Sequence, residues 1–344
     1  MGQRLSRRDF LKLCGLNATS LGFRSMFGNQ VELDSGEMAR VAGRSVSIYD
    51  QPWDKSTVIY QRFRDEIINL YYEVVSDHGP IYNPVWFWVW RGYVHSAHLQ
   101  KVKFSLNTVL SNVPKTGQLA QVTVPISQAM SYSVYNGWEP VYRLYYESNH
   151  WVMGVDVGPD GQPWYRIRDE LLDIDYHAPA VHFRPIQPEE ITPISPDVPF
   201  SQKRIDVFLG RQELTAYENE RVVLHTKISS GVPSVVPPGA IPTKTPTGRF
   251  NVQVKMPSKH MGDGNLTSDT NAYELPGVPW VTFFAQHGVA FHGTYWHMNF
   301  GTVMSHGCVN MHTDDALWLY RWTVPMIQIE DWDKRGYGTQ VTVH

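Results

Sequence analysis

The sequence predicts a mainly β protein in three parts, and three observations support this fold class. From Val46 onward, short runs of Val, Ile, Tyr and Trp alternate with Asp, Pro and Gly turn signals, as in small antiparallel β-domains. A proline-rich stretch at 187–200 interrupts this pattern, and beyond it apolar and polar residues again alternate over strand lengths. One helix is expected near the C-terminus, with Thr313 as its N-cap and two acids in its first turn.

The composition is that of a globular chain with room for more than one core. The chain has 344 residues, of which 42% are hydrophobic and 18% charged. Its net charge of -3 gives no electrostatic reason to expect a nucleic-acid partner.

Residues 1–30 are interpreted as an export signal. The run SRRDFLK at 6–12 resembles the twin-arginine signal, and the weakly apolar stretch after it is too short and too polar to span a membrane. We therefore expect the protein to be exported across the cytoplasmic membrane to the cell wall or periplasm. Residues 31–45 are polar and contain glycine, so they are expected to form a linker.

Two small β-modules are expected at 46–113 and 114–186. Leu-Tyr-Tyr-Glu at 70–73 recurs at 144–147, and His98 and His182 each precede an apolar residue in a similar context. The Trp-containing strands loosely resemble bacterial SH3-like modules of cell-wall enzymes. Each module is thus expected to be β-barrel-like and to be a candidate for binding peptidoglycan. The prolines at 187–200 predict an extended linker to a β-rich domain at 201–344.

Cys308 is the cysteine that remains once Cys14 is placed in the export signal, and a single thiol in an exported protein is a candidate reactive group. It lies in HGTYWHMNFGTVMSHGCVN, residues 292–310. Zinc is one alternative, but His287, His292 and His297 are five residues apart and would face different ways. No CxxC or HExxH pattern accompanies them, so no metal is expected. A buried, inert cysteine is the other alternative.

A cysteine nucleophile with a histidine base fits the residues better. A free thiol is mostly protonated at neutral pH, so it needs a base or a positive neighbour. His292, at the end of an apolar strand, and His306, close to the cysteine, are both candidates. Gly307 would let the backbone approach a substrate closely and would offer an N–H to a developing oxyanion.

The run SHGCVN at 305–310, with His292 and Gly293 upstream, resembles the signature of the L,D-transpeptidases, whose catalytic domain is called YkuD. The resemblance extends from Gln202 to the C-terminus and includes the turn TPTG at 245–248. It implies a β-sandwich-like, mostly antiparallel domain with short helices. It also implies an enzyme that cross-links peptidoglycan stem peptides without a cofactor.

Carried over residue by residue, the resemblance implies that Cys308 is the nucleophile and His292 the general base, steered by the Gly293 carbonyl. Other residues are expected to shape the catalytic loop, the oxyanion site and the substrate pocket: Ser305, His306, Gly307, Asn310, Tyr273 and His260. No role is expected for His297.

The implied reaction is a two-step acyl transfer from a tetrapeptide stem to an amine acceptor, which serves cell-wall biogenesis and cell shape. Water as the acceptor would make the same site an L,D-carboxypeptidase. Another thiol hydrolase and an inactive wall-binding protein are the remaining alternatives. Carbapenems are expected to acylate the thiol. The residues imply no protein partner, and they determine neither the acceptor amine nor the oligomeric state.

Overall fold

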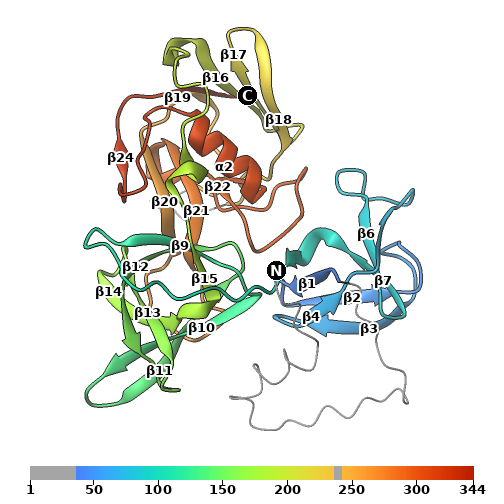
Figure 1. The fold of residues 1–344 in the computed structure, drawn as a ribbon. Coiled ribbons are helices and arrows are strands. Elements are labelled where there is room, and N and C mark those ends of the chain that lie inside the picture. Colours follow the sequence, from blue (N-terminus) through green and yellow to red (C-terminus); the bar gives the residue numbers. More distant parts are fainter. Residues whose placement is uncertain (1–35, 236–241) are drawn as a thin grey trace.

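The computed structural model describes residues 36–235 and 242–344, and in this part of the chain β-strands dominate (Figure 1). The expected export signal lies outside the described residues. Three β units follow one another: a first module at 38–102, a second module at 118–185 and a C-terminal domain at 203–343. The prediction of a mainly β fold is confirmed. Within the described ranges, no helix combines the length and the apolar character that crossing a membrane requires.

The first module joins two antiparallel sheets around one core that includes Ile48, Leu70 and Phe87. Strand order is β4-β1-β8 in one sheet and β3-β2-β7-β6-β5 in the other. The strands are β1 (Met38–Val41), β2 (Ser45–Tyr49), β3 (Val58–Phe63), β4 (Ile67–Asn69), β5 (Tyr72–Val75), β6 (Val85–Val89), β7 (Gly92–His95) and β8 (Leu99–Val102).

Strand β1 corrects the expectation of a linker at 31–45, because its residues pair with both β4 and β8. The sequence hides this strand since it carries a charge at its centre. The Arg40 side chain is buried and forms an ion pair with Asp65 at 2.9 Å. A buried charge is tolerated when it is paired and hydrogen-bonded, so Arg40 belongs to a core strand and not to a solvated segment.

The second module is a single sheet of order β11-β10-β14-β13-β12-β9-β15. Its strands are β9 (Gln118–Val122), β10 (Ile126–Ser133), β11 (Gly137–Tyr145), β12 (Asn149–Val157), β13 (Pro163–Asp169), β14 (Ile174–Pro179) and β15 (Phe183–Pro185). Apolar side chains on one face form its core, among them Leu144, Tyr165 and Phe183.

The two modules end in the same way. A short 3₁₀-helix, η2 (Ser96–His98) or η3 (Ala180–His182), leads directly into β8 or β15, whose first residue is fully buried. The sheets of both modules are open, however, because within the described residues their edge strands are not paired with each other. In the described part of the chain no edge strand closes either module into a barrel, so the barrel-like expectation is wrong as to closure. Closure would require hydrogen bonds between the two edge strands of a sheet.

Residues 187–200 were expected to form an extended linker, but part of this stretch packs on the C-terminal domain. It contains the 3₁₀-helix η4 (Pro188–Ile191), whose Ile191 is buried in the core of that domain. Two of its carbonyl groups accept hydrogen bonds: Thr192 from Arg321 at 2.8 Å and Ile194 from Lys203 at 3.2 Å. This segment therefore has fixed contacts, because its isoleucines bury apolar surface that a free linker would expose.

The C-terminal domain consists of two five-stranded sheets of order β18-β17-β16-β25-β19 and β23-β22-β21-β20-β24. The elements are β16 (Lys203–Phe208), β17 (Glu213–Glu218), β18 (Arg221–Lys227), β19 (Gly248–Asn251), β20 (Val254–Gly262), β21 (Glu274–Ala285), β22 (Val289–Gly293), β23 (Val309–Met311), α2 (Thr313–Trp322), β24 (Lys334–Arg335) and β25 (Gln340–Val343), with short 3₁₀-helices η5 (Phe200–Gln202) and η6 (Gln286–Gly288). Helix α2 packs on β21 and β22. Its N-cap is His312 and not the expected Thr313, a shift of one residue that is common at helix ends.

The second module docks on the sheet that carries β20 and β21, as Figure 1 shows. The Asn149 amide donates to the Pro257 carbonyl at 3.0 Å. At another point of the interface, the rings of Trp151 and Trp332 stack with centroids 4.6 Å apart. Asn149 and Trp151 both belong to β12. This strand therefore shares buried contacts with the C-terminal domain, and the two units are packed against each other.

Candidate active site

His292 lies in β22, a strand whose five residues are all buried. Its Nδ1 is 3.0 Å from the Gly293 carbonyl oxygen. Because a carbonyl only accepts, Nδ1 carries the proton and Nε2 is left with a free lone pair. Burial lowers the pKa of His292 to about 4, although the hydrogen bond to Gly293 opposes this shift. The imidazole is therefore neutral at neutral pH and can act as a base through Nε2.

Cys308 immediately precedes β23, which runs parallel to β22. In the register of this pair His292 lies opposite Asn310, so Cys308, two residues before Asn310, points to the same face of the sheet as His292. The thiol is partly buried, and its Sγ has a weak contact of 3.6 Å to the Gly288 carbonyl. Burial raises the pKa of the Cys308 thiol to about 11. The resting thiol is thus protonated.

The loop before the cysteine is held by Ser305 and Thr245. Ser305 Oγ donates to the Cys308 carbonyl and accepts the Gly307 N–H at 3.1 Å. Thr245, fully buried in the TPTG turn, donates to the Gly307 carbonyl at 2.8 Å. Gly307 has a φ of 129°, which side-chain-bearing residues rarely adopt. Thr245 of this turn therefore helps to hold the loop that presents the thiol, and glycine allows the backbone conformation of that loop.

The backbone donors near the thiol differ from the expectation. The Gly307 N–H, expected to face an oxyanion, is already donated to Ser305. The Cys308 N–H has no acceptor in the described part of the chain. A free N–H on the nucleophile's own residue is well placed to receive the negative charge of a tetrahedral intermediate.

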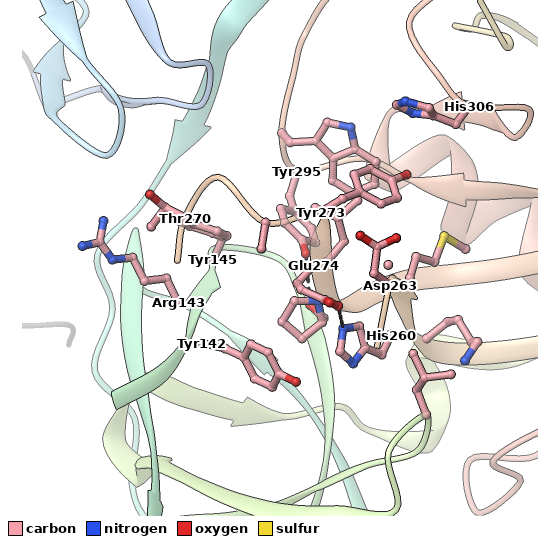
Figure 2. Close-up of a pocket in the computed structure, with 18 of the residues that line it drawn as sticks. Tyr142, Arg143, Tyr145, His260, Asp263, Thr270, Tyr273, Glu274, Tyr295 and His306 are labelled. Carbon is pink, nitrogen blue, oxygen red and sulfur yellow. Dashed lines mark hydrogen bonds and ion pairs between the residues drawn. The ribbon is translucent and has the colours of Figure 1, made fainter. Parts of the chain in front are cut away.

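His306 and Tyr273 lie together at the rim of the site. The His306 side chain is exposed, and its ring centroid is 5.1 Å from that of Tyr273 (Figure 2). Burial raises the pKa of the Tyr273 hydroxyl, and the nearby Cys308 contributes to the shift. The structure thus brings Tyr273 close to the thiol. His306 lacks the buried, oriented tautomer that His292 has.

His260 lines the same cavity but is not free to contact a substrate. Its Nδ1 lies 2.8 Å from an Asp169 carboxylate oxygen. Its Nε2 lies 2.8 Å from a Glu274 carboxylate oxygen, a contact that Figure 2 shows. Burial alone lowers the pKa of His260, but the two carboxylates outweigh it and raise the pKa overall. Because Asp169 belongs to the second module, His260 bridges that module to the C-terminal domain.

His297, for which no role is expected from the sequence, orients a residue of the site. Its Nδ1 accepts the Asn299 N–H at 3.1 Å, so the proton must be on Nε2. Nε2 is 2.8 Å from the Asn310 amide, which must therefore present its oxygen there. In this orientation the NH₂ group of Asn310 points away from His297 and has no hydrogen-bond partner among the described residues. Spacing could not reveal this role, because it depends on which ring nitrogen is already occupied.

The first module supports the segment between the two candidate catalytic residues. The Met298 N–H donates to the Ala97 carbonyl at 3.0 Å, and the Asn83 amide donates to Asn299 Oδ1 at 3.1 Å. Gly301 packs so closely on Tyr82 that an added Cβ would lie 2.7 Å from the Tyr82 carbonyl oxygen. These contacts join residues more than 200 positions apart, so no local pattern could have predicted them.

One cavity of about 1030 Å³ contains the whole candidate site. Its lining includes Cys308, His292, Ser305, His306 and Asn310, and all three units of the chain contribute to it. Within the described residues, no cluster of three or more His, Cys, Asp or Glu side chains is placed to hold a metal ion. A protonated thiol and a neutral imidazole on one face of neighbouring strands are the parts of a thiol nucleophile with its general base.

Comparison with known proteins agrees with this class of site. Residues 202–343 match the family model of the L,D-transpeptidase catalytic domain, YkuD. YqjB of Bacillus subtilis (strain 168), a candidate L,D-transpeptidase by name, is 32% identical over 111 residues, which are 30% of this chain and 60% of YqjB. The chain therefore aligns with about three fifths of that relative's length.

Two solved structures are also similar to the chain. An L,D-transpeptidase from Mycobacterium smegmatis is 24% identical, covering 42% of this chain and 58% of that one with a TM-score of 0.32. The catalytic domain of an Enterococcus faecium L,D-transpeptidase is 24% identical, covering 41% of this chain and 96% of that one with a TM-score of 0.30.

Proposed function

We propose that this protein is a cysteine-dependent L,D-transpeptidase that acylates on a peptidoglycan tetrapeptide stem and transfers it to an amine acceptor. The observation that carries the proposal is the placement of Cys308 and His292 on one face of neighbouring strands, inside a cavity of the domain that matches the L,D-transpeptidase family. In this proposal residues 1–30 direct export, so the enzyme works in the cell wall or periplasm, and the SH3-like modules bind or face peptidoglycan.

In the first step the Cys308 thiol transfers its proton to His292 Nε2 as the sulfur attacks the carbonyl of the L-residue in the donor. The Cys308 N–H stabilises the resulting oxyanion. The C–N bond to the terminal D-residue then breaks, and the departing amine takes the proton from His292. This leaves a thioester and a neutral imidazole, the state required for the second step.

In the second step an amine of another stem attacks the thioester and gives its proton through His292. The C–S bond breaks, the amide cross-link forms, and the thiol regains its proton. Water in place of the amine would release a tripeptide. A carbapenem would stop at the first step, as a covalent adduct on Cys308.

The test is turnover by the full-length protein. Purified protein is incubated with a tetrapeptide donor and an amine acceptor, and the products are identified by mass spectrometry. We expect cross-linked product and free D-residue, no product from Cys308→Ala, and unchanged turnover from Cys14→Ser, the matched cysteine control. Tripeptide alone would instead indicate a carboxypeptidase. Turnover of neither kind, with a reactive thiol, would indicate a hydrolase of another substrate class.

A further inference from the structure

The cavity has a second end, which the N-terminal modules build. Arg40 and Arg64 of the first module and Arg143 of the second line it, with Tyr142 and Tyr145 between them. Figure 2 shows Arg143 beside Thr270 and Tyr145, on the other side of Tyr273 from His306. We call the three arginines the arginine wall. The machinery proposed for acyl transfer uses none of them.

The arginine wall has more positive than negative charge. Asp65 is the carboxylate that pairs with it, since it contacts both Arg40 and Arg143. Arg40 is buried, and its three nitrogens each donate to the protein: Nη1 to Asp65, Nε to Gln100 and Nη2 to the Tyr295 carbonyl. Among the described residues Arg64 has no ion-pair partner and donates only to the Thr270 carbonyl.

Arg143 is well exposed, with 42% of its side chain accessible, and only one of its nitrogens contacts Asp65. Asp263, Asp269 and Glu274 also line the cavity, and within the described residues none of the three forms an ion pair with Arg64 or Arg143. Glu274 pairs with His260 instead. The three arginines carry three positive charges and Asp65 one negative charge, so the arginine wall has a surplus of two positive charges, and Arg64 and Arg143 keep guanidinium N–H groups with no acceptor among the described residues.

A loop encloses this end of the cavity. Residues 263–273, between β20 and β21, are anchored by Arg64 at Thr270 and by Tyr142, whose hydroxyl donates to the Asn265 carbonyl at 3.2 Å. The loop covers part of this end, while the Arg143 side chain stays accessible to a ligand, and a hydrogen bond between two charged groups is stronger than one between neutral groups. A planar guanidinium also matches a carboxylate through two parallel hydrogen bonds.

We propose that Arg64 and Arg143 form a subsite that binds a free carboxylate of the peptide substrate. The inference rests on the proposed function, because a stem peptide carries free carboxylates, and the one bound here lies farther along the peptide than the bond that Cys308 attacks. A peptide that reaches from Cys308 to the arginine wall would thus be selected by the modules as well as by the C-terminal domain. The arginines act on binding and take no part in the covalent steps.

The test is equilibrium binding to the full chain with Cys308→Ala, which removes turnover. Two probes are compared by calorimetry: a stem tetrapeptide with free carboxylates and the same peptide with its carboxylates amidated. The free peptide should bind more tightly, and Arg64→Gln with Arg143→Gln should weaken it about tenfold or more. The amidated peptide should change little. Arg44→Gln is the matched control, because Arg44 is exposed in the same module and does not line the cavity.

Equal binding of the two peptides to the Cys308→Ala chain, or an equal loss of both on substitution, would overturn the subsite. If the double substitution lowers the melting temperature strongly, Arg64→Lys and Arg143→Lys decide instead. Lysine keeps the positive charge but cannot form the two parallel hydrogen bonds of a guanidinium. The lysine variants should therefore reduce the preference for the free carboxylate only in part. Turnover by the unsubstituted chain tests the proposed function separately, because carboxylate preference without turnover would leave the subsite standing.

Discussion

Burial shifts the pKa values of Cys308 and His292 in opposite directions. Burial raises the pKa of the thiol to about 11 and lowers that of the imidazole to about 4, because a charged form of either group is poorly solvated there. A thiolate–imidazolium pair is therefore disfavoured at rest. The proton should move only as the sulfur attacks a bound carbonyl, which protects the thiol from unproductive reactions.

This pairing predicts an unusual pH profile for acylation by a carbapenem. His292 must be neutral, so the rate should fall only as the pH drops through about 4, and it should be flat across neutral pH. In His292→Gln, thiolate can arise only by titration, so the rate should fall by about 10²-fold or more at neutral pH and then rise about tenfold per pH unit. Adduct formation measured by mass spectrometry at several pH values checks this.

His306→Gln is the matched control, because His306 is exposed at the rim of the site. It should keep the flat profile. A tenfold rise per pH unit in His306→Gln, with a flat profile in His292→Gln, would exchange the roles of the two histidines.

At the scale of elements, the segment from β22 to β23 is what brings base and nucleophile together. It leaves the sheet at Gly293 and returns at Val309, and on the way it rests on the first module. Asn83 is buried and donates to both Met298 and Asn299. From Asn299 the hydrogen bonds continue through His297 to Asn310, beside His292.

Asn83→Ala is therefore expected to slow acylation of Cys308 about tenfold, because the loop loses two anchoring hydrogen bonds and the thiol is less well positioned. The rate constant should fall while the apparent affinity for the donor changes little, a split that steady-state kinetics measures. Asn107→Ala is the control. Asn107 makes a similar number of hydrogen bonds, which tie the segment between the two modules to Thr123 and Val181 of the second module, and none of them involves the loop. Asn107→Ala should therefore lower stability alone. Equal kinetic losses in both variants would refute the positioning role.

The sequence was informative about the active-site loop because its signal is local. SHGCVN and the apolar strand ending in His292 carry their chemistry in short runs, and the structure places both in one cavity. The sequence does not predict contacts between residues that lie far apart along the chain. In the sequence Arg40 resembles an exposed charged residue, because only the fold brings Asp65 beside it. The sequence alone therefore predicts a linker where β1 lies. Arg64 and Arg143 gain a shared role only through the docking of two modules.

At the scale of the whole molecule, the three units enclose the site together, and His260 is one of the bridges between them. It lies between Asp169 of β13 and Glu274 of β21, with Glu170 and Lys259 paired close by. The carboxylates raise the pKa of His260 despite its burial, so the folded protein binds this proton more tightly than the unfolded chain does.

The stabilisation by His260 should be complete below about pH 6.5, the pKa of an unfolded histidine, and should be lost as the pH rises through the higher folded value. The difference in melting temperature between wild type and His260→Gln should therefore shrink as the pH rises above about 6.5. His182→Gln is a contrast, because burial lowers the pKa of His182 to about 4: its difference from wild type should grow from about pH 4 to about pH 6.5 and stay constant above that. A His260 difference that grows with pH would contradict the bridge.

The contact between Gly301 and Tyr82 has a consequence for engineering of the chain. An added Cβ at Gly301 would press on a backbone atom of another unit, which side-chain repacking cannot relieve. An unrelated module in the place of the first one would bring a different backbone to that point. The first module and the C-terminal domain are thus expected to behave as a matched pair, and chimaeras that exchange the module are expected to lose this fit.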